Sequence, residues 1–124
     1  MNVRSMLGNP SCSGALECFF ELNEFEVEAY KTLVKEGPLK VEELACSLKK
    51  DRSTAYRALK TLMSSGLCFK STKTISRGGY YHVYLARPPK EVKQEILRLV
   101  DAWYGNMKLA AKEFDKFDGR KKAD

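Results

Sequence analysis

The segment from Asp51 to Gly66, DRSTAYRALKTLMSSG, limits most strongly what this chain can fold into, because it reads as one helix with a signal at each end. The Asp51 carboxylate is a good N-cap, since it accepts hydrogen bonds from free N–H groups of the first turn and suits the positive end of the helix dipole. Gly66 readily takes the left-handed conformation that ends many helices. The apolar residues between them recur at helical spacing, and they predict a buried face made of Ala55, Ala58, Leu59, Leu62 and Met63.

The other face of this predicted helix is polar. It carries Ser53, Arg57, Lys60 and Ser64, with Arg52 and Tyr56 on its flanks. Arginine can contact guanine through two hydrogen bonds, serine reaches bases or phosphates, and lysine neutralises phosphate, so this face suits the major groove of DNA. A charged outer face is also the norm for a surface helix. The helix alone therefore leaves both interpretations open.

The excess of positive over negative charge is concentrated around this helix and in the segment that follows it. The whole chain has a formal net charge of +6. Residues 1–48 hold four basic and eight acidic side chains, net −4, whereas residues 49–77 hold eight basic side chains and one acid, net +7. Residues 78–124 hold ten and seven, net +3. A patch of this kind attracts polyanions, so the charge pattern favours the DNA interpretation.

Length and composition indicate one globular domain, since the chain has 124 residues, of which 44% are hydrophobic and 31% charged. A transmembrane helix needs about 20 consecutive apolar residues, and no such run is present. The first residues, MNVRSMLGNPSCSG, lack the long apolar region of a signal peptide. We therefore expect a cytoplasmic protein.

The cysteines and the single histidine, His82, predict no metal site and no cofactor, because Cys12, Cys18, Cys46 and Cys68 include no Cys-x-x-Cys pair. Cys46 and Cys68 sit among apolar residues and are expected to be buried. Cys12 and Cys18, near the start of the chain, are either inert or a redox pair. With one histidine, no glycine-rich phosphate loop and no nucleophile–base pair, the chain is not expected to be an enzyme.

Two shorter helices are predicted before Asp51. Asn23 and Glu26 have the spacing of a capping box, and the helix that they start ends at Gly37 and Pro38. Its expected buried stripe is Phe25, Ala29, Tyr30, Leu33 and Val34. The next helix runs from Val41 to Leu48, with an inward face of Val41, Leu44, Ala45 and Leu48. Lys49 and Lys50 then turn the chain into the Asp51 helix, which gives a helix-turn-helix.

A β-hairpin is predicted after Gly66. LCFKSTKTI alternates in part, residues 76–79 (SRGG) form a turn, and YYHVYLA is dense in β-formers. Such a hairpin directly after a helix-turn-helix is a wing, whose Lys73 and Arg77 can reach DNA phosphates or the minor groove. The hairpin also has the simpler interpretation of completing the core, and both can hold together.

One long helical pattern runs from Pro89 to about Phe117. Apolar residues recur there at steps of three or four, which forms a seam of Val92, Ile96, Leu99, Trp103, Met107, Ala110, Phe114 and Phe117. This seam is longer than a small winged-helix body needs, so it predicts a coiled-coil-like pair between two subunits. The alternative is a helix that folds back on its own domain.

The segment GPLKVEELACSLKKDRSTAYRALKTLMSSGLCFKS resembles the winged helix-turn-helix of archaeal TrmB-like transcriptional regulators and, more distantly, that of MarR-type regulators. The resemblance covers about residues 20–87. It implies a homodimer that binds DNA through a recognition helix, with a wing at Lys73–Gly79 assisting. The residues that it assigns to DNA in the helix are Arg52, Ser53, Thr54, Tyr56 and Arg57.

Two features depart from that pattern. Lys40 stands where such sequences often have a capping Thr or Ser, and because lysine cannot cap, the helix that follows is expected to start weakly or at another residue. The larger TrmB-like proteins also carry a C-terminal sugar-binding domain, and none fits within 124 residues. We therefore expect the small form of the family, and any small-molecule effector stays open.

The predicted fold is mainly α-helical with one β-hairpin. We expect an N-terminal arm and short helix in residues 1–22, a winged helix-turn-helix domain in 23–87, a long C-terminal dimerisation helix in 88–118 and a disordered tail in 119–124. The dimerisation residues are Val92, Ile96, Leu99, Trp103, Met107, Ala110 and Phe114.

The predicted function is sequence-specific binding of double-stranded DNA by a dimeric transcriptional regulator. Helix 51–66 lies in the major groove, and wing 70–80 lies on the backbone or in the minor groove. The predicted DNA-binding residues are Lys49, Lys50, Arg52, Ser53, Thr54, Tyr56, Arg57, Lys60, Lys73 and Arg77. The alternative is a winged helix that serves as a protein-interaction module in a transcription complex.

Overall fold

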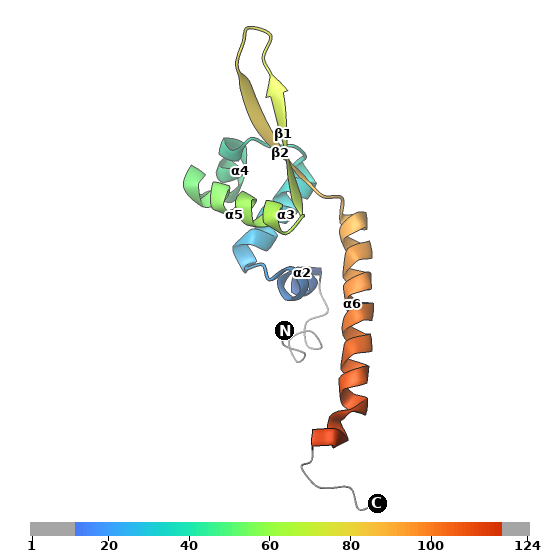
Figure 1. The fold of residues 1–124 in the computed structure, drawn as a ribbon. Helices are drawn as coiled ribbons and strands as arrows, with labels where there is room; N and C mark the ends of the chain where they lie inside the picture. The colour runs from blue at the N-terminus through green and yellow to red at the C-terminus, as the bar shows by residue number, and fades with distance from the viewer. Residues whose placement is uncertain (1–11, 118–124) are drawn as a thin grey trace, which may run out of the picture.

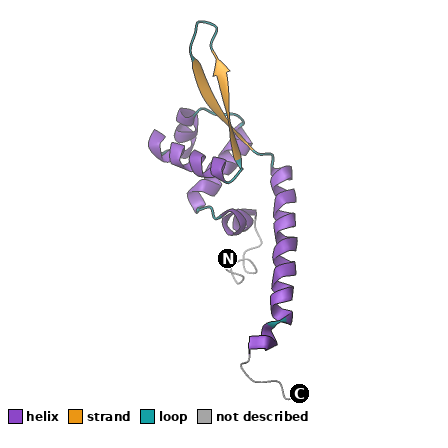
Figure 2. Cartoon of the chain, in the orientation of Figure 1, coloured by secondary structure: helices purple, strands orange, loops and turns teal. Residues whose placement is uncertain are grey.

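The computed structural model describes residues 12–117, and it confirms the predicted fold class. The elements in chain order are the helices α2 (Cys12–Phe20), α3 (Glu24–Glu36), α4 (Val41–Leu48) and α5 (Arg52–Ser64), the strands β1 (Cys68–Thr74) and β2 (Tyr80–Ala86), the helix α6 (Pro89–Lys112) and the short 3-10 helix η1 (Phe114–Phe117). Figures 1 and 2 show α2 to α5 as one body, from which the hairpin projects at one end. Helix α6 runs beside the body and continues past it at the other end.

The signals that predicted the helix ends work as expected. Asn23 Oδ1 accepts a hydrogen bond from the Glu26 N–H (2.8 Å), and Glu26 Oε1 accepts one from the Asn23 N–H (2.9 Å), which completes the capping box of α3. Gly66, at φ 76°, follows α5, and the next residue, Leu67, donates its N–H to the Leu62 carbonyl (2.9 Å). Helix α4 starts at Val41, so the expectation that Lys40 would shift its start to another residue was wrong. Lys40 makes no side-chain capping bond, but its N–H donates to Glu43 Oε1 in the first turn (2.7 Å).

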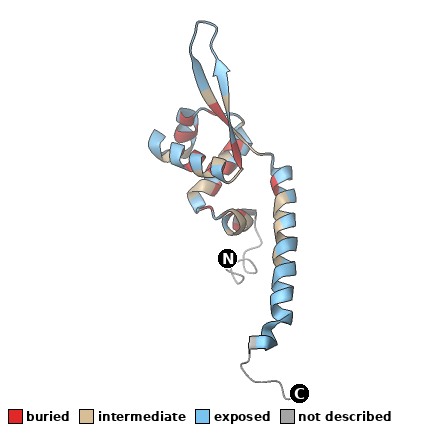
Figure 3. Cartoon of the chain, viewed as in Figure 1, coloured by how far each residue is buried: buried red, intermediate tan, exposed pale blue. Residues whose placement is uncertain are grey.

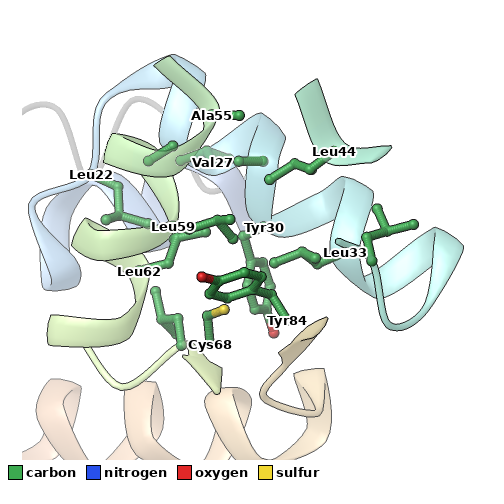
Figure 4. Packing of buried hydrophobic residues seen from close by; sticks show 14 of the residues in the cluster. Leu22, Val27, Tyr30, Leu33, Leu44, Ala55, Leu59, Leu62, Cys68 and Tyr84 are labelled. Atoms are coloured by element: carbon green, nitrogen blue, oxygen red, sulfur yellow. The ribbon is translucent and has the colours of Figure 1, made fainter. Parts of the chain in front are cut away.

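One hydrophobic core joins α2, α3, α4 and α5 with the base of the hairpin (Figures 3 and 4). Its largest fully buried side chains are Leu16, Leu33, Leu44, Leu59, Leu62 and Leu67. Leu16 of α2 and Leu22, which follows that helix, belong to the same cluster as the helix-turn-helix. The short N-terminal helix therefore packs on the body.

Two residues that were predicted to be buried are exposed, and the predicted stripe of α3 lacked one buried residue. Val34 is 39% exposed, because it lines an open groove beside Pro38 and Pro88. Cys46 is also exposed, because α4 turns its other side, with Leu44, toward the core. Val27, which lies outside the predicted stripe of α3, is buried in the core. Cys68 is buried as expected, and its desolvation raises the pKa of its thiol to about 11.

The hairpin is antiparallel, and its register pairs Cys68 with Ala86 and Thr74 with Tyr80. Leu39 extends this two-stranded sheet, since its N–H donates to the Tyr84 carbonyl (3.1 Å) and its carbonyl accepts from the Tyr84 N–H (2.7 Å). The base of the hairpin is packed into the body. Residues 72–80 are all exposed, so the outer part stands free of it (Figure 3).

The buried contacts of helix α6 with the body lie near its start. Val92 is buried, and Ile96 packs against the core. The Tyr30 hydroxyl donates to the Arg87 carbonyl (2.7 Å), and the Arg87 N–H donates to the Leu67 carbonyl (2.9 Å). The Arg87 side chain forms ion pairs with Glu91 and Glu95 on the first turns of α6. The junction between β2 and α6 is thus held by hydrogen bonds to the body and by ion pairs to α6.

The predicted end of this helix at about Phe117 was wrong. Helix α6 ends at Lys112, and the chain continues into η1. The helical spacing of Phe114 and Phe117 extends the seam in sequence, but spacing alone cannot distinguish an α-helix from a following 3-10 turn. Gly105 lies within α6 and does not interrupt it.

Between residues 12 and 117, no helix is both long and apolar enough to cross a membrane. Most of the predicted loose arm, the side chain of Cys12 and the predicted tail 119–124 lie outside the described residues.

Candidate nucleic-acid interface

Helix α5 presents the polar face that the sequence predicted. Ala55, Ala58, Leu59 and Leu62 are buried on its back, whereas Ser53, Tyr56, Arg57 and Lys60 are exposed on its front and flank and Thr54 is half-buried. The Lys60 ammonium lies 5.9 Å from the centre of the Tyr56 ring, close enough for a cation–π contact. The Arg57 guanidinium donates to the Thr54 hydroxyl (3.4 Å) and so lies along the helix surface.

Asp51 fixes the start of this helix. Its Oδ1 accepts a hydrogen bond from the Thr54 N–H (3.0 Å). Hydrogen bonds from the Thr54 side chain and backbone lower the pKa of Asp51, and the charge of Arg57 adds to this effect. Because the folded-state pKa is lowered, the stabilisation is present at neutral pH and is lost as the pH falls through that pKa.

The turn between α4 and α5 carries Lys49 and Lys50, both exposed and directly before the start of α5. Lys49 has φ 58° and ψ 43°, which is the left-handed conformation that favours glycine. The N–H groups of this turn are satisfied, since Lys49 donates to the Cys46 carbonyl (3.2 Å) and Lys50 to the Ala45 carbonyl (3.0 Å). A lysine thus occupies a strained position, next to the predicted DNA-binding helix.

We expect Lys49→Gly to raise the free energy of unfolding by about 0.5–1 kcal/mol, because a side chain in the left-handed region costs about 1–2 kcal/mol and the greater freedom of unfolded glycine offsets part of the gain. The same change should weaken DNA binding, since it removes a cation. Urea unfolding and a DNA titration measure the two effects. If Lys49→Gly were less stable than the wild type, the left-handed backbone at Lys49 would not be strained. If its affinity for DNA were unchanged, Lys49 would not belong to the DNA interface.

Arg52 lies on the flank of α5 that faces α4 and the hairpin. Its Nε forms an ion pair with Glu42 Oε2 of α4 (3.2 Å). Arg52 lines a cleft of about 220 Å³ together with Lys40, Val41, Glu42, Tyr81, His82 and Tyr84. In this cleft the Lys40 ammonium lies 4.6 Å from the centre of the Tyr81 ring.

Sequence reasoning did not include Lys40, Tyr81 or His82 in the site. It considered Lys40 only as a poor cap, whereas the pairing of Leu39 with Tyr84 brings β2 beside the start of α4. A single bridge between two residues leaves no periodic signal in the sequence. The many β-forming residues in 80–86 were the one feature of the sequence that indicated a strand as the third element of the cleft, beside α4 and α5.

The hairpin carries Lys73 and Arg77 on its free outer part, where both are exposed. Its tip is closed by the Ile75 N–H, which donates to the Gly79 carbonyl (3.1 Å). Gly78 and Gly79 have φ values of 97° and 90°, so both glycines are required by this turn. The structure brings the basic turn, α5 and the hairpin into one region of the body, whereas α6 extends away from it (Figure 1).

The distal half of α6 carries the apolar residues that the body does not cover. Met107 is 45% exposed and Phe114, beyond the helix in η1, is 73% exposed. Leu99 and Trp103 are half-buried, and Ala110 is exposed. The seam is therefore continuous from the buried Val92 into a surface that is exposed in a single subunit.

Comparison with protein families decides the identity of the chain. The family model described as "Sugar-specific transcriptional regulator TrmB" matches residues 16–90. This chain belongs to the TrmB family. The match includes α3, α4, α5 and the hairpin, together with most of α2. The family and the fold are those of winged-helix transcriptional regulators, not of enzymes.

Relatives of this TrmB-family chain occur in archaea. It is 36% identical over 100 residues to the uncharacterized protein MJ1503 of Methanocaldococcus jannaschii, a match that covers 81% of this chain and 76% of the relative. A second uncharacterized protein of that organism, MJ1082, is 34% identical over 93 residues and is covered to 77%.

Solved structures share the fold of the TrmB-family chain. A possible transcriptional regulator from Methanosarcina mazei Go1 superposes with a TM-score of 0.69 at 21% identity, over 85% of this chain and 87% of that one. TrmBL2, described as an archaeal chromatin protein with a novel mode of DNA binding, gives a TM-score of 0.61 at 25% identity, over 84% of this chain and 38% of its own. MepR of S. aureus, solved as a DNA complex, gives 0.52 at 14% identity, over 84% of this chain and 86% of that one.

Proposed function

We propose that this TrmB-family chain is a dimeric transcriptional regulator that binds double-stranded DNA in a sequence-specific way. The observation that carries the proposal is that α5 has one apolar, buried face and one polar, exposed face. Its apolar back is buried in the core, and its exposed front holds Ser53, Tyr56, Arg57 and Lys60 between a basic turn and a basic hairpin. A rigid helix with such a front suits direct reading of base edges in the major groove.

The roles within this interface divide by position. Ser53, Arg57 and Lys60 point away from the core and are assigned to the major groove, with Thr54 and Tyr56 at its edge. Lys49, Lys50, Arg52, Lys73 and Arg77 surround that face and are assigned to phosphates. Phosphate contacts set the affinity and its salt dependence, whereas base contacts set the sequence preference.

The second part of the proposal is the homodimer. Residues 23–87 form the DNA-binding unit, and residues 88–118 hold the second copy through the seam Val92, Ile96, Leu99, Trp103, Met107, Ala110 and Phe114. The exposed apolar residues in the distal half of α6 support this assignment, because an exposed apolar surface of this length is typical of a contact with a partner. Two recognition helices about one turn of DNA apart favour a roughly palindromic operator.

A gel-shift titration with genomic DNA fragments tests the function. We expect retardation at low salt, with an affinity that falls steeply as the salt concentration rises, because neutralised phosphates release counterions. Absence of retardation at low salt would contradict the proposal and would favour the alternative, a winged helix that serves as a protein-interaction module. The DNA complex of MepR and the description of TrmBL2 as a DNA-binding protein support the DNA interpretation.

A further inference from the structure

We propose that the cleft between α4, α5 and β2 is a phosphodiester-binding site, with Lys40 and Arg52 as its cations. The proposal rests on the function proposed above and adds the root of the hairpin to the interface. The cleft has a volume of about 220 Å³, and it brings Lys40, Arg52, Tyr81 and His82 together from three elements. None of these elements would form such a site alone.

Lys40 is placed to bind an anion. Its ammonium lies 4.6 Å from the centre of the Tyr81 ring, which holds the side chain over the cleft wall while its charge stays exposed. A lysine side chain has no hydrogen-bond acceptor, so it cannot cap α4. The Glu43 carboxylate also lies at this helix start, where its Oε1 accepts from the Lys40 N–H (2.7 Å). The N–H groups in the first turn of α4 thus receive no cap from Lys40 and can face solvent or a ligand at the positive end of the helix.

Arg52 adds a second cation, which Glu42 holds in place. The ion pair joins Arg52 Nε to Glu42 Oε2 (3.2 Å), and a guanidinium has two further nitrogens that donate hydrogen bonds. The Glu42 carboxylate opposes an anion, so the cleft carries a formal charge of +1 from its three charged residues. The end of the α4 dipole adds to that positive charge.

The position of the cleft identifies the anion as the DNA backbone. Arg52 is the first residue of α5, and Tyr81 and His82 lie in β2 at the root of the free part of the hairpin. If α5 lies in the major groove and the hairpin reaches the neighbouring minor groove, the phosphodiester strand that separates the two grooves must pass between them. In this arrangement the phosphodiester backbone lies against the cleft.

The test is a titration of a random-sequence DNA duplex with Lys40→Gln, measured by fluorescence anisotropy between about 50 and 200 mM salt. We expect a roughly three- to tenfold loss of affinity and a salt slope reduced by about 0.9, because one phosphate contact is removed. Lys40→Arg should retain both values, since it keeps the charge. Lys93→Gln removes the same charge from exposed α6 and is the matched control, with no change in slope expected.

Three outcomes would overturn the site while leaving the proposed function intact. The first is wild-type affinity and slope in Lys40→Gln, and the second is the same change in Lys93→Gln. The third is inorganic phosphate that binds the wild type but not Lys40→Gln at matched ionic strength without displacing DNA, which would make the cleft a free-phosphate site. Failure of the wild-type protein to bind any DNA would instead overturn the proposed function itself.

Discussion

Met107→Glu is expected to convert the proposed dimer to a monomer, with at least about a hundredfold weaker association. Burying a methionine side chain contributes about 1.5–3 kcal/mol to the free energy of association, and a twofold dimer would lose this contribution twice. The substitution also places two carboxylates in the interface, where they lose solvation. Met107 is already 45% exposed in the single subunit, so the fold of each subunit should remain intact. Sedimentation equilibrium measures the association, and thermal unfolding of the variant at low concentration checks the subunit.

The matched control for this prediction is Gln94→Glu, which places the same new charge on the side of α6 away from the seam. Gln94 is exposed, so the control should remain dimeric. The monomeric variant should also lose affinity for a two-site operator far more than for a random duplex, because only the operator engages both subunits at once. A Met107→Glu protein that sediments as the wild type would exclude the distal seam from the interface.

Arg57→Ala is expected to weaken binding to a selected operator by about 1–3 kcal/mol, or roughly 5- to 160-fold, while binding to random DNA changes little. The reason is that Arg57, at the exposed centre of α5, is proposed to make base contacts that random sequences cannot reproduce. The present hydrogen bond to the Thr54 hydroxyl is long (3.4 Å), so exchanging it for a guanine costs little. Titrations of both DNA molecules at one salt concentration give the comparison.

Arg98→Ala removes an equal charge from the exposed surface of α6 and provides the control for Arg57→Ala. It should leave both affinities near the wild-type values. If Arg57→Ala weakened the operator and the random duplex equally, Arg57 would be assigned to the backbone, and Ser53 or Lys60 would become the main candidate for base contacts.

The helices were predictable from the sequence because their ends carry local chemical signals. Asn23 and Glu26 form the capping box that their spacing predicted, and Asp51 and Gly66 bound α5 as expected. Burial was less predictable, because it depends on which neighbours are present. Val34 follows the helical spacing of the predicted buried stripe of α3, but it borders an open groove instead of packed side chains.

One part of the candidate site was likewise predictable from the sequence, and the other part was not. The front of α5 follows from the period of one helix, so Ser53, Arg57 and Lys60 were identifiable from sequence. The cleft requires α4, α5 and β2 to meet, and the contact that joins α4 to β2 is the pairing of Leu39 with Tyr84. This pairing links residues 45 positions apart through two backbone hydrogen bonds, which any residue except proline can form.

In the proposed dimer, the attachment of α6 links the packing of this helix to the distance between the two copies of α5. Its 24 residues span about 36 Å, and the buried contacts with the body lie within the first third. If the subunits join along the distal half, a tilt of roughly 10° about that contact moves each body by about 3 Å, close to the 3.4 Å rise of one base pair. Small changes in the packing of the two α6 helices would therefore change which operator spacing the dimer fits.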